Sequence, residues 1–213
     1  MSFLRLSVIM LLCSLYLPGC LPAGHPVQPI TLYTLQYSSP APKGAPVDGV
    51  VQVDRFSAVR SYDGNAMIFR PDPYRVVAYN YHKWRTTPGD MVSEHLLQDF
   101  QNCGLFRAVF SWRQPEGARF VVEGMIEEFA ETKEHAPWEA DLDVRVTLLD
   151  RGEHGNAGEV VFQKRYRVVK TVTDGSPEAF AAGMSAAMAQ ASEEIIIDVS
   201  GAIRGGAGPE ESR

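Results

Sequence analysis

The cysteine at position 20 is the side chain with the clearest prospect of chemistry. It ends the stretch Leu17-Pro18-Gly19-Cys20, which follows an apolar run of 12 residues from Leu6 to Leu17. That run has the length of a secretory h-region and is too short to span a bilayer as a helix. Arg5 precedes the run and a helix-breaking Pro-Gly pair follows it, so residues 1–19 are predicted to be a signal peptide.

The surroundings of Cys20 resemble the bacterial lipobox, with an apolar residue three places before the cysteine and glycine immediately before it. In that motif the thiol receives a diacylglycerol, the preceding peptide is cleaved and the new amino terminus is acylated. Pro18 departs from the small or β-branched residue that is usual at its place. We therefore expect a covalent lipid on Cys20 and no other cofactor. The alternative is an ordinary signal peptide that is cut elsewhere.

The other two cysteines offer no disulfide. Cys13 lies in the predicted signal peptide, so Cys103 is the only further thiol of the mature chain. With Cys20 carrying lipid, no intramolecular disulfide is possible, even in an oxidising compartment. Cys103 falls on the apolar face of a predicted helix and is interpreted as a small buried hydrophobe. A catalytic thiol is the alternative, but no motif places a histidine beside it.

The charge of the chain excludes several classes of partner. Its formal net charge is −6, and loss of residues 1–19, whose only charged side chain is Arg5, lowers −6 to −7. No cluster of Lys and Arg offsets this acidity, so neither nucleic acid nor electrostatic binding to anionic lipid is expected. Membrane attachment must then come from acyl chains, and several chains on one cysteine meet the requirement for more than one anchoring signal.

The common motifs of enzymes are missing from the sequence. There is no nucleophile elbow, no HExxH, no phosphate loop and no dinucleotide fingerprint. The histidines lack a metal-ligand partner at useful spacing and are interpreted as solvated surface residues; they are His25, His82, His95, His135 and His154. The sequence therefore predicts no metal site and no enzyme, with a hydrolase of unrecognised site as the alternative.

The chain divides by composition into four parts. After the signal peptide, proline-rich residues 20–30 predict a short extended tether, residues 31–203 one domain, and residues 204–213 a disordered tail. Strands are predicted over 31–37, 49–56, 119–132, 138–150 and 159–173, with a hairpin of 67–70 and 74–79, and helices over 88–103 and 177–203. Each helix begins with a capping Thr or Ser followed by proline. This order predicts an α+β fold: a mostly antiparallel mixed sheet with two helices packed on one face.

Charged residues alternate with apolar ones along the central predicted strand. Glu139, Asp141 and Asp143 share one face of it, and this cluster could bind a divalent cation. The neighbouring strands supply charges of both signs, namely Lys164, Arg165 and Arg167 on one side and Glu123 and Glu127 on the other. Cross-strand ion pairing on a solvated sheet face explains the pattern without a cofactor, and it is the interpretation we favour.

Aromatic and basic residues also gather at 79–85, just before the first helix. A partner-binding surface is one interpretation, because Trp, Tyr and Arg dominate interface hot spots. The other is packing, in which the tryptophan and one tyrosine fasten the start of the helix to the sheet. Packing is favoured for the aromatic residues. The partner-binding candidates are Tyr79, Tyr81, Trp84 and Arg85.

Several weak signatures together resemble one family. Tyr33-Thr34-Leu35 is similar to its "YYTL" start, and Val51-Gln52-Val53 to its second segment. The run from Tyr79 to Trp84 into Pro88–Phe100 resembles its aromatic element before a helix. The strand EADLDVRVTLLD, the strand around Lys164-Arg165-Tyr166-Arg167 and the alanine-rich last helix fit as well. Over residues 20–203 the chain resembles the ABC-type transport auxiliary lipoprotein components (PqiC-like).

That resemblance implies a non-catalytic lipoprotein. It would be the docking piece or end-ring of an MCE-type lipid transport system, and it could act there as a homo-oligomer. The implied partners are an MCE-domain protein together with an ABC permease and ATPase, or paraffin-inducible-type membrane proteins. Leu21 is not the aspartate associated with inner-membrane retention, which favours the outer membrane, facing the periplasm. The alternative is an envelope-biogenesis or secretion-assembly lipoprotein that binds another periplasmic partner.

Overall fold

The computed structural model describes residues 28–114, 117–152 and 158–206. The predicted signal peptide, Cys20 and residues 207–213 of the predicted tail lie outside the described residues. The strands are β1 (Thr31–Tyr33), β2 (Val47–Val53), β3 (Ser57–Ala58), β4 (Ala66–Asp72), β5 (Arg75–Trp84), β6 (Phe106–Ser111), β7 (Phe120–Thr132), β8 (Glu139–Asp150) and β9 (Glu159–Thr171). The helices are the 3₁₀ turn η2 (Arg60–Tyr62), α2 (Pro88–Asn102) and α3 (Pro177–Gly206).

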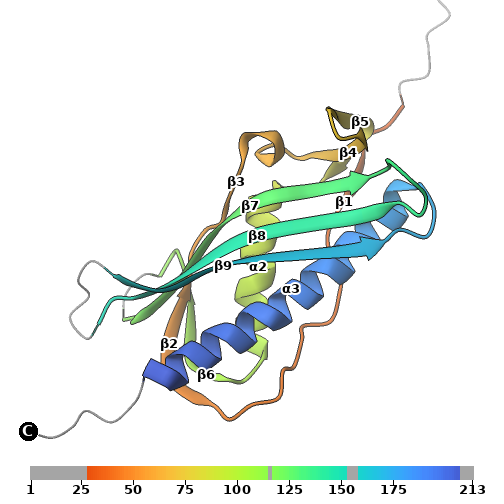
Figure 1. Ribbon diagram of the computed structural model, residues 1–213. Helices are drawn as coiled ribbons and strands as arrows, with labels where there is room; N and C mark the ends of the chain where they lie inside the picture. Colours follow the sequence, from red (N-terminus) through yellow and green to blue (C-terminus); the bar gives the residue numbers. More distant parts are fainter. Residues whose placement is uncertain (1–27, 115–116, 153–157, 207–213) are drawn as a thin grey trace, which may run out of the picture.

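All the strands join one curled mixed sheet built around β7. One edge of β7 pairs along its whole length with β8, which in turn pairs with β9. The other edge of β7 pairs, one after another along its length, with short segments of β2, β3 and β4. Figure 1 shows β7, β8 and β9 side by side across the front of the molecule, with α3 and α2 behind them. The α+β prediction, with two helices on one face of a mixed sheet, is confirmed.

The direction of pairing differs between long and short strands. The long pairs β7–β8 and β8–β9 and the hairpin β4–β5 are antiparallel. The short pairs that β2, β3 and β4 make with β7, and the pairs β1–β5 and β2–β6, are parallel. Helix α2 connects β5 to β6, and β6 pairs with β2 and not with β5. Strands β3 and β6 were not expected, and β6 is the parallel neighbour that this crossover adds.

Both helices begin as their sequences predict. The Thr87 hydroxyl oxygen accepts a hydrogen bond from the Asp90 backbone N–H (3.3 Å), and Pro88 occupies the first turn. The Ser176 hydroxyl oxygen accepts one from the Ala179 N–H (3.1 Å) at the start of α3. Helix α3 lies close to the sheet because its inner face is made of small side chains and glycine; a Cβ built on Gly183 would lie 3.1 Å from that of Ala140.

The core lies between the sheet and the two helices. From α3 it takes a stripe at helical spacing: Phe180, Met184, Ala187, Met188, Ala191, Ile195, Val199 and Ile203. From the central strand it takes Ala140, Leu142, Val144 and Val146, as their alternation predicts. Helix α3 continues to Gly206, so residues 204–206, expected in a disordered tail, belong to the helix.

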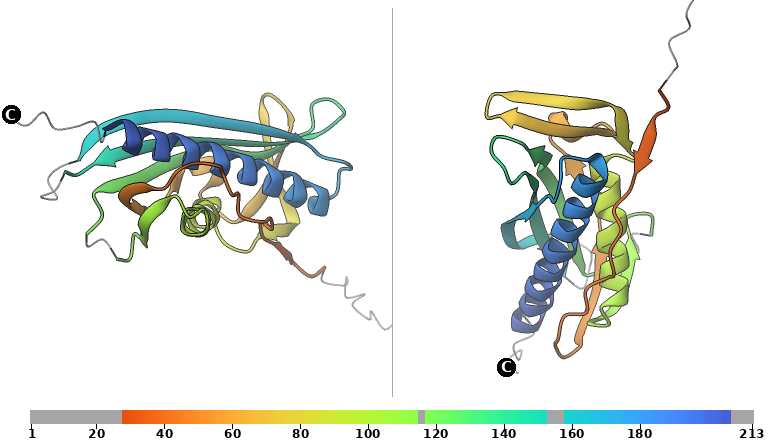
Figure 2. Two further views of the ribbon diagram at one scale, coloured as in Figure 1. Left: turned by 90° about the horizontal axis from the view of Figure 1, so that it is seen from below. Right: turned by 90° about the vertical axis from the view of Figure 1, so that its right-hand side faces the viewer.

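The first predicted strand is shorter than expected. Only Thr31–Tyr33 pair with β5, whereas residues 34–46 run as a strap along the helices (Figure 2, left). Leu35 of the strap is buried in the core. The strap is fastened by hydrogen bonds from the Gln36 backbone N–H to the Ser185 hydroxyl (3.0 Å) and from the Tyr37 hydroxyl to the Asp99 carboxylate (2.7 Å). Contacts with helix side chains thus replace strand pairing here.

Candidate functional site

The aromatic and basic segment at 79–85 contains a bulge in β5, between Ala78 and Lys83. Ala66 of β4 faces Lys83, whereas Ile68 faces Ala78, so two steps along β4 match five along β5. The three extra residues interrupt the ladder where the chain approaches α2. Strands β4 and β5 form a hairpin, residues 66–84, which we call the arm; the bulge lies at its root and the tip lies beyond it. The bulge therefore joins the arm to the body of the molecule.

Trp84 is a core residue, which corrects its prediction as a partner-binding side chain. Its side chain is 0 % exposed and packs edge-on against Phe129 and Phe180, with ring centroids 5.3 and 5.5 Å away. It thereby joins the root of the arm to β7 and to the start of α3. The packing interpretation of the segment is correct for this residue.

Tyr79 also points inward, and its contacts were not foreseen. Its hydroxyl donates a 2.6 Å hydrogen bond to Glu131, whose carboxylate is fully buried, and burial raises the pKa of Tyr79. The Lys133 ammonium lies 3.1 Å from that carboxylate and 4.4 Å from the ring centre of Trp138. Burial also raises the pKa of Glu131. Alternation along β7 places Glu131 on the inner face, and this was the only sequence signal for a buried carboxylate here.

The remaining two candidates, Tyr81 and Arg85, stay exposed. Tyr81 is 43 % exposed in the bulge. Arg85 borders a groove of about 220 Å³ on the helix side of the molecule, between the strap and α2, together with Gln36, Glu94, His95 and Gln98. The structure thus leaves one aromatic and one guanidinium side chain of this segment for a partner.

Two of the histidines predicted to be solvated are partly buried. His95 stacks on Tyr37 with ring centroids 5.0 Å apart, and burial lowers its pKa. His82 lies within hydrogen-bond distance of the Tyr33 hydroxyl (2.9 Å). His135 is exposed, as predicted. His25 and His154 lie outside the described residues.

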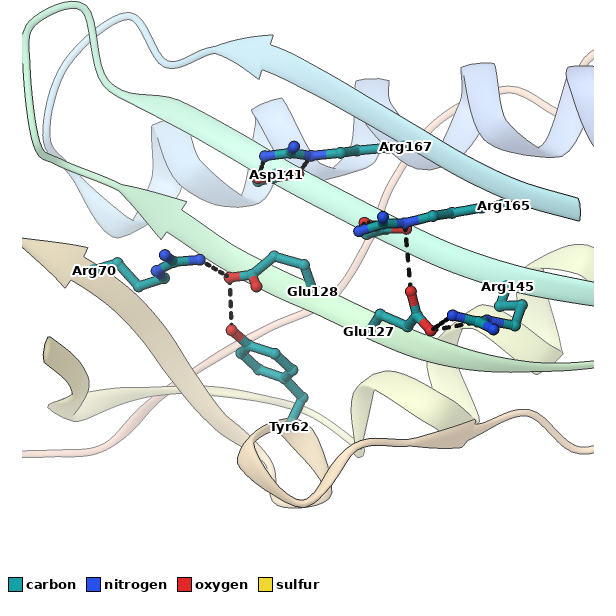
Figure 3. A network of polar contacts seen from close by, with 9 residues as sticks. Tyr62, Arg70, Glu127, Glu128, Asp141, Arg145, Arg165 and Arg167 are labelled. Atoms are coloured by element: carbon teal, nitrogen blue, oxygen red, sulfur yellow. Dashed lines mark hydrogen bonds and ion pairs between the residues drawn. The ribbon is translucent and has the colours of Figure 1, made fainter. Parts of the chain in front are cut away.

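The outer face of the sheet carries the predicted cross-strand ion pairs (Figure 3). Arg167 donates two hydrogen bonds to Asp141 (3.0 and 2.6 Å), and Arg165 pairs with Asp143 in the same way. Hydrogen bonding to the carboxylates raises the pKa of both guanidinium groups. The Asp141 side chain is only 5 % exposed because Arg167 covers it. The favoured interpretation of the charge pattern, ion pairing, is confirmed for these residues.

The ion pairs extend to both neighbours of the central strand. Glu127 receives Arg145 (2.8 Å), and Arg165 lies 3.3 Å from it. At the end near the arm, Glu128 accepts a hydrogen bond from the Tyr62 hydroxyl (2.6 Å) and pairs with Arg70 (3.1 Å). The result is a chain of charged side chains from β9 to β4.

Lys164 does not belong to this face. It reaches the other way, to Asp198 of α3 (2.5 Å), which also accepts a hydrogen bond from the Tyr166 hydroxyl (2.7 Å). The period of two along a strand places residue 164 opposite to 165 and 167, so the sequence contained the signal for this correction.

An open hollow of about 600 Å³ lies on the outer face beside β3. Its lining mixes charges of both signs with one exposed apolar side chain, Met125; the polar residues include Asp54, Arg55, Glu123, Glu127, Arg145, Thr147 and Gln163. Within the described ranges, no group of three His, Cys, Asp or Glu residues has the geometry to hold a metal ion. Of the acidic residues that the sequence analysis singled out, Asp141, Asp143 and Glu127 are held in ion pairs.

Cys103 is half-buried at the end of α2. Its sulfur lies 3.2 Å from the Phe100 carbonyl oxygen, and burial raises the pKa of the thiol. A raised pKa lowers the share of the nucleophilic thiolate, which agrees with the interpretation as a small hydrophobe. In the part of the chain that the structure describes, no helix is both long and apolar enough to cross a membrane.

Comparison with known proteins identifies the class. The family model of the ABC-type transport auxiliary lipoprotein component matches residues 33–196. The chain belongs to this family, as its resemblance suggested. The match runs from Tyr33, the last residue of β1, through most of α3, and includes the bulge and the ion-paired strands. No functionally curated protein matches the chain.

Solved structures confirm the fold. A protein from Xanthomonas campestris of family DUF330 has a TM-score of 0.74 at 19 % identity, covering 83 % of this chain and 98 % of the other. An uncharacterized protein reaches 0.64 at 11 % identity, covering 80 % and 99 %. A hypothetical protein from Chlamydia trachomatis reaches 0.53 at 15 % identity, covering 73 % and 98 %. At these identities the likeness concerns the fold alone.

Proposed function

We propose that this protein is a non-catalytic lipoprotein, anchored through a lipid on Cys20, that serves as docking component of an MCE-type ABC (phospho)lipid transport system. The observation that carries the proposal is the family match over residues 33–196, which makes the chain a transport auxiliary component. The lipobox-like sequence at Cys20 supports the anchor, and Leu21 supports the outer membrane, facing the periplasm.

The proposed docking surface is the exposed part of the segment 79–85. Tyr81 and Arg85 are the residue types that carry interface energy, and Arg85 borders a groove into which a partner side chain fits. An MCE-domain protein is the proposed direct partner, with the permease and ATPase, or paraffin-inducible-type membrane proteins, beyond it. Self-association into a homo-oligomer is part of the proposal and is measured by light scattering of the detergent-solubilised protein.

Crosslinking followed by purification from native membranes tests this proposal. The wild type should recover an MCE-domain protein. The variant Tyr81→Ala with Arg85→Ala should recover about thirtyfold less of it, since two interface anchors of about 1 kcal/mol each together contribute about 2 kcal/mol. The matched control is Val160→Ala with Arg107→Ala, which removes exposed side chains of similar kind elsewhere.

Two results would contradict parts of the proposal. Recovery of a secretion or cell-wall protein in place of transport components would refute the MCE assignment. An unmodified Cys20 in the mass spectrum of the native protein would refute the anchor. Cys20→Ala should move the protein from the membrane fraction to the soluble periplasmic fraction.

A further inference from the structure

The outer half of the arm exposes apolar side chains that the fold does not use. Eleven large hydrophobic residues are exposed among those that the structure describes, and three of them lie on this half. Tyr74 at the tip is 94 % exposed, and Val76 and Val77 follow it on β5, whereas Ile30 and Leu32 are exposed at the root, where Leu32 pairs with Lys83.

Tyr74 is held outward by the turn beneath it. The Asp72 carboxylate accepts a hydrogen bond from the Tyr74 backbone N–H (3.0 Å) and pairs with the Arg75 guanidinium. Val76 and Val77 point to opposite faces of the strand, and both faces are exposed here. No layer of the described fold covers either face, so the apolar side chains at the tip have no packing role.

The arm lies at the end of the molecule where the chain enters. In Figure 2 (right) it crosses the top, above the β7–β9 side and away from α2, while α3 ends at the bottom. Gln28, the first described residue, follows Cys20 by eight positions in the sequence. Fully extended, a segment of this length reaches about 28 Å. A lipid on Cys20 therefore keeps this end, and not the opposite one, next to the bilayer.

We infer that the tip of the arm is a second membrane contact that lies in the interface of a phospholipid bilayer and orients the domain. The inference rests on the anchor of the proposed function. Tyrosine suits this place because its ring is apolar and its hydroxyl reaches the headgroups. Arg75 is paired with Asp72, so the tip offers no net charge and needs no anionic lipid. This leaves Tyr81 and Arg85, at the root of the arm, for the protein partner.

Fluorescence of a label at the tip tests the inference. The full lipidated protein, in a Cys103→Ser background, carries Tyr74→Cys or Val76→Cys labelled with an environment-sensitive dye. It is reconstituted into phosphatidylcholine vesicles that contain nitroxide-labelled lipid. The matched control is Val161→Cys, which is also exposed but lies on β9 towards the other end of the molecule. Thermal unfolding of each variant checks that it is folded.

We expect a blue-shifted emission and at least twofold stronger quenching at positions 74 and 76 than at 161. Equal quenching at all three positions, in protein that floats with the vesicles, would overturn the membrane contact and leave the anchor intact. Failure of the wild type to float would refute the anchor itself and, with it, this inference. A contact that needs anionic lipid would overturn the uncharged mode of binding.

Discussion

The arm and the β7–β8–β9 body belong to one sheet but are stabilised in different ways. In the body, twelve residue pairs join β7 to β8 with a single register shift. Helix α3 covers the inner face of β8 and β9, α2 packs against β7, and ion pairs cover the outer face. In the arm, β4 and β5 pair with two register shifts, and the outer half has no covering layer.

The difference indicates that the residues that stabilise the fold and the residues that can contact other molecules lie in different parts of the protein. A strand that is covered on both faces is held by packing on one side and by charge pairing on the other. The arm is held at its root, where Trp84 enters the core and Tyr79 binds Glu131, and by the pairing of Phe69 and Arg70 with β7. Its tip has no such support. Substitutions at the root should therefore unfold the protein, whereas substitutions at the tip should change only what the protein contacts.

Removal of the Trp84 ring should have the largest effect. Trp84→Ala leaves a cavity between Phe129 and Phe180, and a loss of about 3–5 kcal/mol in the free energy of unfolding is expected. Urea unfolding followed by circular dichroism measures it. The matched control is Tyr74→Ala, at the exposed tip of the same arm, which should change stability by about 0.5 kcal/mol at most. Similar losses in the two variants would refute the division between root and tip.

The ion pairs of the body should give an intermediate effect. Asp141→Asn removes the charge that Arg167 binds and is expected to cost about 1–2 kcal/mol. The loss stays below that of a fully buried pair because Arg167 can turn to water. Asp48→Asn, whose partner Arg107 is largely exposed like Asp48 itself, is the control and should be nearly neutral. A neutral Asp141→Asn in the same urea measurement would show that the outer face contributes no stability.

Glu131 should make the root of the arm sensitive to pH by a smaller amount. Burial raises its pKa above the ordinary 4.5, so the folded protein holds this proton at a pH where the unfolded chain has released it. The stabilising contribution is complete below 4.5 and is lost as the pH rises through the folded pKa. Wild type should therefore lose stability relative to Glu131→Gln between acid and neutral pH. Parallel stability curves for the two proteins would contradict this expectation.

Elements with strong local signals were predictable from the sequence. The capped helices α2 and α3, the long strands β7–β9 and the ion pairs of the outer face all follow from spacing within one segment or between adjacent strands. Strand β6 was missed because most of its residues are half-buried, without a clear alternation. The parallel pairs of β7 with β2, β3 and β4 join distant segments, and no local pattern reports them.

The candidate site was only partly predictable. The composition of residues 79–85 marked an unusual segment, and this segment does contain a bulge. Which side chains turn inward depends on the three extra residues in β5, and these become visible only when β5 is set against β4. Trp84 and Tyr81 therefore could not be told apart from their types alone.

The parallel pairing of β1 with β5 has a mechanical consequence for a tethered protein. A pull on the amino terminus acts along the axis of Thr31–Tyr33, so their hydrogen bonds to β5 are loaded together, in shear, and are not peeled apart one by one. Further along the chain, the hydrogen bonds from Gln36 to Ser185 and from Tyr37 to Asp99 transmit the remaining force to α3 and α2. The helices thus take up load from the envelope before the central strands experience it.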